Sequence, residues 1–245
     1  LGNVGFHAAK FLSEEDGVKV TAIIERDGAI INDDGLDIEA VHLHRTENGG
    51  VKGFPSSKYV EDGHSVLEKE CDILLPAALE SQITLENADR IKTKLIAEAA
   101  NGPVTFGADQ ILREKGVVII PDAYLNAGGV TVSYFEWIKN LSHIRFGRME
   151  RRYEEAQSRG LVAAIEEATG KPLNDLTKGK LIAGPDEIDL VRSGLDDTMR
   201  GAYNRIRDIY LERDKVVDLR TAAFVLAIEH IADCYQIGRA HVCTP

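Results

Sequence analysis

Glycines and short amide side chains follow several apolar segments of this sequence, and this pattern is typical of nucleotide binding. The first of them open the chain, where Gly2 and Gly5 stand three residues apart at the start of a helical segment. They match the second half of the loop G-x-G-x-x-G, whose glycines let backbone N–H groups at a helix N-terminus approach a pyrophosphate. Half of such a loop is also compatible with a simple tight turn. The candidates for phosphate binding are Gly2, Asn3, Val4 and Gly5.

An acidic residue, Glu25, has the sequence position from which a carboxylate can contact the ribose of a dinucleotide. Glu25 follows the apolar run 18–24 and comes 20 residues after Gly5. At this spacing a carboxylate accepts hydrogen bonds from the adenosine ribose and repels a 2′-phosphate. Its neighbour Arg26 is able to receive such a phosphate, so the sequence favours NAD and leaves NADP open. The competing interpretation of Glu25 is an ordinary solvated acid at a strand end.

Three further turns place a small residue or an amide directly after a strand. Ala78, Asn101 and Asn126 each follow an apolar run of strand length, and these runs are 71–76, 94–98 and 117–120. Ligands of open α/β sheets bind beyond the carboxyl ends of the strands. The Asn126 side chain offers a donor and an acceptor to a nicotinamide carboxamide. Each turn alone would be ordinary, but the series indicates a dinucleotide.

The elements that must position these residues alternate between strands and helices. Helices are expected at 4–12, 37–47 and 105–115, and a short hairpin arm at 29–31 with a turn at 32–35. Alternation of this kind predicts an α/β fold with a parallel sheet. We expect a Rossmann-like doubly wound sheet whose first strand would precede Leu1. That strand is central in such folds, so we interpret the sequence as a truncated reading frame.

The character of the sequence changes after Trp137. Residues 150–167 are helical but so polar that a core position is a poor explanation. A loop is expected at 171–184, and two further helices at 195–213 and 221–234.

Composition excludes several classes of protein. The net charge of −11 argues against nucleic acid or an anionic membrane as a partner. No run of 18 apolar residues exists, so no membrane span is expected. The three cysteines have neither disulfide nor metal spacing. His42 and His44 would suit a metal on a strand, but a solvated loop is the preferred interpretation.

Over residues 1–236 the sequence resembles the C-terminal part of glutamate dehydrogenase. The segments that carry the resemblance are Gly2–Gly5, Cys71–Ala78, Ala97–Pro103, Pro121–Asn140, Ser193–Met199 and Asp218–Ala223. The family's reaction is the reversible oxidative deamination of L-glutamate to 2-oxoglutarate and ammonium with NAD or NADP. Its catalytic lysines and aspartate lie in an N-terminal domain, so we assign no catalytic residue here, and no metal ligand.

The resemblance also implies individual roles. Cofactor contacts are implied at Asn3, Glu25, Ala78, Asn101 and Asn126. Val130 and Ser133 would line the pocket for the glutamate side chain, with Ser133 near its distal carboxylate. They lie about one turn apart on the helix after Gly129, so they can face one ligand.

The resemblance implies three segments. These are a dinucleotide-binding domain at 1–138, a protruding helical antenna at 139–192, and a pivot helix with a C-terminal helix at 193–236. Residues 237–245 are expected to be a foreign tail. The tail resembles the translation of a sequencing-library adapter, if a UGA codon is read as cysteine at Cys243.

Antenna-bearing relatives are hexamers, are regulated by purine nucleotides and reside in mitochondria. We therefore expect a homo-oligomer, a hexamer, in the mitochondrial matrix, with the cytoplasm as the alternative. Lys10, Glu14, Arg192 and Gly201 differ from the residues at nucleotide sites of the animal enzymes. We expect weak or absent inhibition by GTP.

Two alternatives stay open. One is another amino-acid dehydrogenase of the same superfamily, acting on leucine or phenylalanine. The other is a non-catalytic nucleotide-binding subunit. The first is tested by the substrate range and the second by the catalytic groups of the complete polypeptide.

Overall fold

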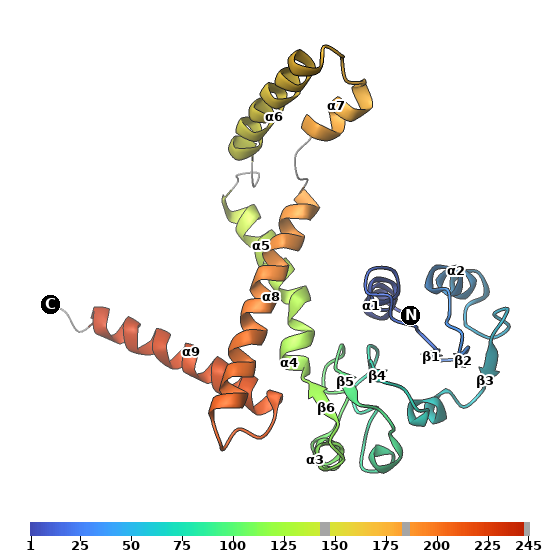
Figure 1. Cartoon of the computed structure of the whole chain (residues 1–245). Coiled ribbons are helices and arrows are strands. Elements are labelled where there is room, and N and C mark those ends of the chain that lie inside the picture. Colours follow the sequence, from blue (N-terminus) through green and yellow to red (C-terminus); the bar gives the residue numbers. More distant parts are fainter. Residues whose placement is uncertain (143–147, 183–186, 243–245) are drawn as a thin grey trace. The chain divides into compact units, whose positions relative to one another are not determined.

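The computed structural model in Figure 1 describes residues 1–142, 148–182 and 187–242. Contacts between residues divide the chain into two compact units, Leu1–Asn126 with Ile206–Pro245, and Ala127–Arg205. Strands and helices make the chain an α/β protein, which confirms the predicted fold class. The predicted boundaries at 138, 192 and 236 stay predictions, and residues 243–245 of the predicted foreign tail lie outside the described residues.

The strands of the first unit form two three-stranded sheets. One is antiparallel, with β1 (Ala22–Glu25), β2 (Gly28–Ile31) and β3 (Lys58–Val60). The other is parallel, with β4 (Ile73–Leu74), β5 (Leu95–Ala97) and β6 (Val118–Ile120). No hydrogen-bonded strand joins β1 to β4 in the described part of the chain.

The parallel pattern predicted from the sequence is therefore correct for β4–β6 and wrong for β1–β3. The reason is the short connection between β1 and β2. Only Arg26 and Asp27 separate β1 from β2. A two-residue turn permits an antiparallel hairpin, whereas parallel neighbours need a crossover of a dozen or more residues. The first strand also begins at Ala22, later than the predicted start at residue 18.

Helices of the first unit confirm the predicted segments. They are α1 (Asn3–Glu14), α2 (Ile38–Asn48), α3 (Phe106–Glu114), α4 (Asp122–Leu125) and α9 (Leu219–Val242), with 3-10 turns at Gly63–Glu68 and Ala88–Arg90. The ends of α2 follow from local chemistry. The Asp37 side chain accepts a hydrogen bond from the Ala40 N–H at 3.0 Å, and Gly49 ends the helix with φ of +77°.

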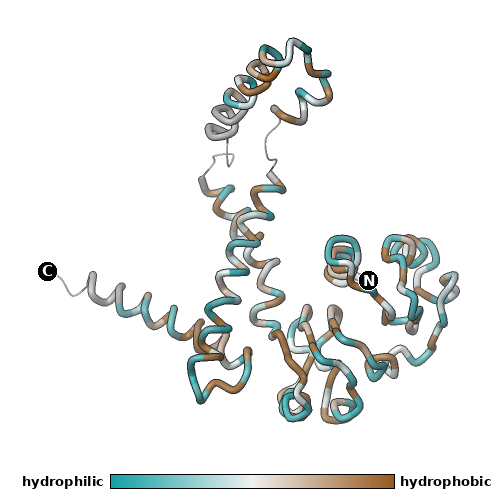
Figure 2. The backbone as a smooth tube through the Cα atoms, viewed as in Figure 1, coloured by the Kyte–Doolittle hydropathy of each residue, from teal (hydrophilic) through white to brown (hydrophobic). Residues whose placement is uncertain are grey.

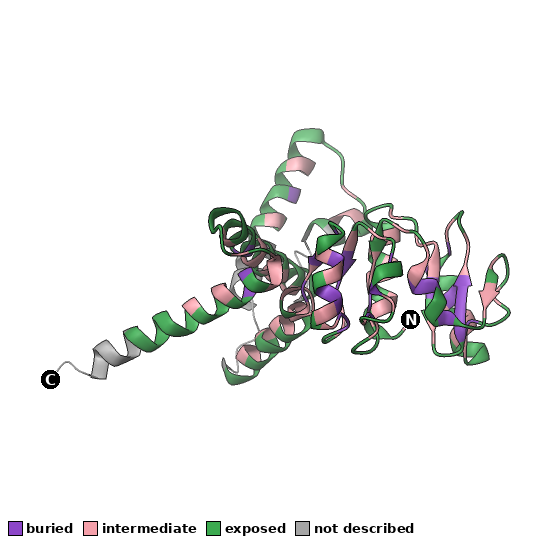
Figure 3. Cartoon of the chain, turned by 90° about the horizontal axis from the view of Figure 1, so that it is seen from below, coloured by how far each residue is buried: buried purple, intermediate pink, exposed green. Residues whose placement is uncertain are grey.

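Each of the two sheets packs into its own cluster of buried apolar side chains. Ile83, Ile96 and Leu112 are fully buried beside the parallel sheet, and Ile30 and Val41 beside the antiparallel one. Figure 2 shows β6 as a continuous hydrophobic stretch, while α8 (Glu187–Glu212) mixes both kinds of residue. In Figure 3 the buried residues concentrate on the strands, and most of the helix leading to the C-terminus is exposed. The ends of the strands are therefore anchored by buried apolar clusters.

The second unit is helical and contains α5 (Ala127–Ser142), α6 (Arg148–Thr169), α7 (Asp175–Ile182) and most of α8. Helices α5 and α8 pack closely, because a Cβ added at Gly194 would lie 3.5 Å from the Phe135 ring. The predicted loop at 171–184 is wrong, since it contains α7. Asn174 caps this helix by accepting a hydrogen bond from the Thr177 N–H at 2.8 Å, so a polar cluster that reads as loop is a helix start.

Within the described ranges, no helix combines the length and the apolar character that crossing a bilayer requires.

Candidate functional site

The N-terminus of α1 offers open backbone donors. Gly2 is the N-cap residue, in an extended conformation, and its position carries no side-chain cap. A Cβ added there would meet nothing within 4 Å. The first-turn N–H groups of a helix have no partner inside the helix and attract anions. Asn3 and Val4, both exposed, lie in this first turn.

Gly5 brings this helix to the end of the parallel sheet. A Cβ added at Gly5 would lie 3.7 Å from the Cβ of Ala77. The next residue, Ala78, is exposed and lies in the turn that follows β4. The glycine segment and the end of β4 are thus neighbours, although about 70 residues separate them in the sequence.

Glu25 ends β1 and is largely enclosed, with its side chain 14% exposed. The Arg45 Nε of α2 lies 3.1 Å from its Oε1. The structure therefore does not show the solvated strand-end acid of the competing interpretation. The adjacent Arg26 is exposed.

The two predicted amides meet at the carboxyl edge of the parallel sheet. Asn126 Nδ2 donates a hydrogen bond to Asn101 Oδ1 at 2.6 Å. Asn101 lies in the turn after β5, and Asn126 ends the short helix α4 after β6. Asn101 is exposed and Asn126 half-buried. Paired amides of this kind still offer unused donors and acceptors to a flat carboxamide.

An ionic cluster behind these amides was missed by the sequence reasoning. Arg220 of α9 donates through Nη2 to both carboxylate oxygens of Glu98, at 2.8 Å each, and through Nη1 to Asp122 Oδ1 at 2.9 Å. Glu98 is 0% exposed. An acid that directly follows the apolar run 95–97 was the available signal, because a buried charge requires a partner elsewhere in the chain.

Electrostatics of this cluster are set by burial and by close partners. Burial raises the pKa of the Glu98 carboxyl above its ordinary value, and the Arg220 guanidinium opposes that rise. Burial also acts to lower the pKa of Arg220. The carboxylates of Glu98, Asp109 and Asp122 outweigh it, so the pKa of Arg220 lies above its ordinary value.

The predicted substrate residues lie on α5, in the second unit. Val130 is 73% exposed, and Ser133 is exposed as well. Ser133 Oγ donates to the Gly129 carbonyl oxygen at 3.1 Å. A hydroxyl bound to its own helix can turn to a ligand at small cost, so this geometry is compatible with carboxylate binding.

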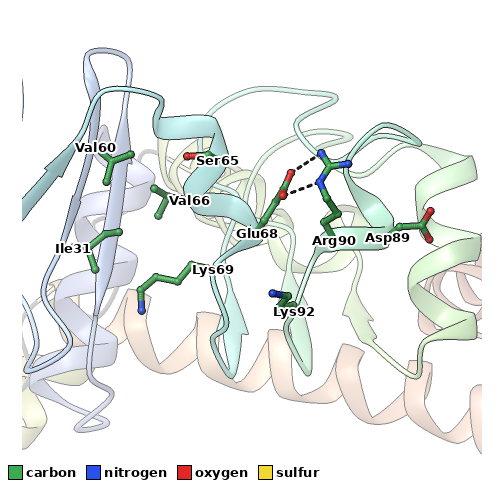
Figure 4. A pocket seen from close by; sticks show the side chains of 9 residues that line it. All are labelled: Ile31, Val60, Ser65, Val66, Glu68, Lys69, Asp89, Arg90 and Lys92. Carbon is green, nitrogen blue, oxygen red and sulfur yellow. Dashed lines mark hydrogen bonds and ion pairs between the residues drawn. The ribbon is translucent and has the colours of Figure 1, made fainter.

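A hollow elsewhere in the first unit is a different feature. It is lined by residues of β2, β3 and the two 3-10 turns, as Figure 4 shows: Ile31, Val60, Ser65, Val66, Glu68, Lys69, Asp89, Arg90 and Lys92. None of the predicted cofactor or substrate residues lines it. Glu68 and Arg90 already pair across it, at 2.7 and 2.8 Å.

Among the described residues no three His, Cys, Asp or Glu side chains converge as metal ligands do. His42 and His44 lie in helix α2, so neither the strand nor the loop considered for them is correct. The His42 ring stacks on Phe6, with ring centroids 4.1 Å apart.

Known proteins that are similar to this chain are amino-acid dehydrogenases. The family model described as Glutamate/Leucine/Phenylalanine/Valine dehydrogenase matches residues 1–189. A probable glutamate dehydrogenase from Sinorhizobium fredii is 50% identical over 233 residues, which cover 95% of this chain and 53% of that protein. The mitochondrial glutamate dehydrogenase of Dictyostelium discoideum is 49% identical over 236 residues, covering 96% and 46%.

Solved structures give the same result. The crystal structure of glutamate dehydrogenase from Peptoniphilus asaccharolyticus matches with a TM-score of 0.63 and 28% identity, over 96% of this chain and 45% of that one. A hetero-hexameric glutamate dehydrogenase from Thermus thermophilus has a TM-score of 0.70 at 21% identity, over 95% and 44%, and shares the fold. The chain spans about half the length of the curated relatives it matches. It belongs to the glutamate/leucine/phenylalanine/valine dehydrogenase family.

Proposed function

We propose that this chain is the coenzyme-binding portion of a glutamate dehydrogenase, which interconverts L-glutamate with 2-oxoglutarate and ammonium using NAD, with NADP as the alternative. The observation that carries the proposal is the Asn101–Asn126 amide pair at the carboxyl edge of the parallel sheet. Relatives about 50% identical to the chain bear the name glutamate dehydrogenase.

The chain's own residues would bind and orient the coenzyme. Backbone N–H groups from Gly2 to Gly5 would hold the pyrophosphate, and the Glu25 carboxylate would accept hydrogen bonds from the adenosine ribose. Ala78 leaves room beside the dinucleotide, and the Asn101–Asn126 pair would fix the carboxamide. The nicotinamide supplies the hydride-accepting carbon when it is bound. Positioning of that ring is the main task of this portion of the protein.

Substrate selection would fall to α5. Val130 would pack on the glutamate side chain, and the Ser133 hydroxyl would donate to its distal carboxylate. A leucine or phenylalanine dehydrogenase would gain nothing from that hydroxyl, because those substrates have no acceptor there. Proton transfer would depend on the lysines and the aspartate that the family resemblance assigns to an N-terminal domain.

The experiment uses the polypeptide from the complete reading frame. Steady-state rates are measured with L-glutamate, L-leucine and L-phenylalanine, each with NAD and with NADP. We expect glutamate to have the highest kcat/KM. Turnover of leucine or phenylalanine far above glutamate would replace the proposal with the related dehydrogenase. Binding of NADH by calorimetry without turnover of any of the three would support the non-catalytic subunit.

For assembly and location we propose a homo-hexamer in the mitochondrial matrix. The hetero-hexameric Thermus enzyme supports oligomerisation, and the Dictyostelium relative supports the mitochondrion. Light scattering of the purified complete protein tests the first point, and imaging of a C-terminally tagged protein tests the second.

A further inference from the structure

One arginine at the start of α9 reaches three carboxylates from three other parts of the chain. Arg220 contacts Glu98 after β5, Asp122 at the start of α4, and Asp109 of α3, whose Oδ1 lies 3.5 Å from Arg220 Nε. These residues belong to the same compact unit. The Arg220 side chain is only 26% exposed. The contact joins segments about 100 and 120 residues apart.

The two acids that follow strands are also bound to the backbone. Glu98 Oε2 accepts a hydrogen bond from the Asp122 N–H at 2.8 Å. Asp122 Oδ2 accepts one from the Gly102 N–H, also at 2.8 Å. Gly102 has φ of +52°, in the left-handed region that favours glycine, so this turn has a defined shape. Arg220 therefore reaches the backbone of both turns through one intermediate side chain.

The amides sit directly on these turns. Asn101 precedes Gly102, and Asn126 ends the four-residue helix that Asp122 begins. We propose that Arg220 is a positioning residue for the coenzyme: through Glu98 and Asp122 it holds the two turns at the distance that pairs Asn101 with Asn126. This inference rests on the proposed function, because it assigns these amides to coenzyme binding.

Arginine is required for this role on geometric grounds. Its planar fork points donors in three directions at once, whereas a lysine ammonium is a point charge on a flexible stem. The start of α9 is itself fixed. Arg113 Nη1 lies 3.1 Å from Asp218 Oδ2, and Asp218 Oδ1 accepts the Thr221 N–H at 2.6 Å. The guanidinium thus projects from an anchored helix end.

The test uses two variants of the complete polypeptide. Asp122→Asn leaves Arg220 on Glu98 but cannot accept hydrogen bonds from both Arg220 and Gly102 as the carboxylate does. Arg220→Lys keeps the charge and loses the fork. We expect each to raise the Kd for NADH and the KM for NAD by about 10-fold or more, since small misplacements of positioning groups have effects of this size. The KM for glutamate should stay within about 3-fold.

Arg213→Gln is the matched control. Arg213 pairs with Glu229 of α9 at 2.7 and 3.1 Å, but this pair is 45% exposed and does not contact the strand ends. The control should leave NADH binding within about 2-fold, because exposed ion pairs contribute little. Melting temperatures are measured for every variant, and binding is measured well below them.

The outcomes separate the two proposals. Failure of the unaltered protein to bind NADH contradicts the proposed function. Normal binding by the unaltered protein together with unchanged NADH affinity in Asp122→Asn and Arg220→Lys overturns the positioning role. Equal weakening of coenzyme and glutamate, or an equal effect of Arg213→Gln, also overturns it, because a general loss of structure would give that result.

Discussion

Two acids end strands of this protein, and their surroundings differ. Glu25 is the last residue of β1, and its Oε1 lies 3.1 Å from the Arg45 Nε of α2. Glu98 follows β5, is fully buried, and has both oxygens bound by Arg220. Glu98 thus uses its whole carboxylate to join distant segments of the chain, whereas the ion pair of Glu25 links β1 to α2. Residue type and strand-end position alone do not separate these cases.

Replacement of Glu25 tests the coenzyme preference. In Glu25→Ser we expect the ratio of kcat/KM for NADP to that for NAD to rise by about 10- to 100-fold, because the carboxylate that repels a 2′-phosphate is gone and the exposed Arg26 remains. Initial rates with both coenzymes in the complete polypeptide provide the measurement. The double variant Glu25→Ser with Arg26→Ala should lose most of this gain. An unchanged ratio in Glu25→Ser would show that this acid does not face the ribose.

Replacement of Ser133 tests how the side chain of the amino acid is recognised. We expect Ser133→Ala to raise the KM for glutamate by about 10-fold, the worth of one hydrogen bond to a charged group, and to leave NADH binding unchanged. Thr131→Val is the control, since the Thr131 hydroxyl donates to the Ala127 carbonyl of the same helix at 3.0 Å. Equal effects of both substitutions would mean that the hydroxyls only stabilise α5.

Helices α6 and α7 form a hairpin, and Glu166 of α6 bonds to α7 and to the turn between the two helices. Glu166 Oε1 accepts hydrogen bonds from Lys178 Nζ at 2.8 Å and from the Leu173 N–H at 2.7 Å. The hydrogen bond from Lys178, followed by that from Leu173, holds the pKa of Glu166 below its ordinary value of 4.5. The polar sequence of α6 is thus compatible with a defined local structure.

The sign of the pH effect follows from that lowered pKa. An ionised Glu166 stabilises the hairpin above pH 4.5, and this contribution is lost as the pH falls through the lower value of the folded state. We expect the hydrogen-exchange protection of the Leu173 amide to decrease over that range. In Glu166→Gln the protection should be lower at neutral pH and change little with acidification.

Glu167→Gln is the matched control for this hairpin, because its exposed carboxylate is the next residue in the sequence. It should retain the pH dependence of the unaltered protein. If Glu166→Gln also retains it, another acid closes the hairpin.

The predicted response to GTP concerns the complete enzyme. Lys10, in the first unit, is engaged by Glu39 and lies 3.9 Å from Glu14, while Arg200, in the second unit, pairs with Asp196 at 2.7 Å. Cations that are already paired with carboxylates offer less attraction to a triphosphate.

We therefore expect GTP at about 100 µM to change the rate of the complete enzyme by less than about 2-fold, a coupling below the usual allosteric range. Rates of glutamate oxidation with and without GTP test this. Inhibition at micromolar GTP would contradict it. Glu14→Arg, which reverses one of the charges, should increase the sensitivity to GTP if this site is the relevant one.

Much of the fold could be predicted from local patterns. The apolar runs before Pro76, Asn101 and Pro121 correspond to the strands of the parallel sheet, because buried strands read as short continuous hydrophobic segments. The helix α7 could not be predicted in this way, since a short polar helix has the composition of a loop. The hairpin arm predicted at 29–31 is part of β2, but its tight turn lies before it, at Arg26 and Asp27, and not at the predicted residues 32–35.

Sequence by itself determined which residues are candidates for binding a dinucleotide, since glycines, a strand-end acid and amides have chemistry that depends on residue type and spacing. Only the tertiary structure decided that Asn101 and Asn126 bond to each other, that Glu25 is enclosed, and that Arg220 connects α9 to both turns. Contacts between residues 20 to 120 positions apart depend on how the sheet and helices pack, and the local sequence carries no record of that packing.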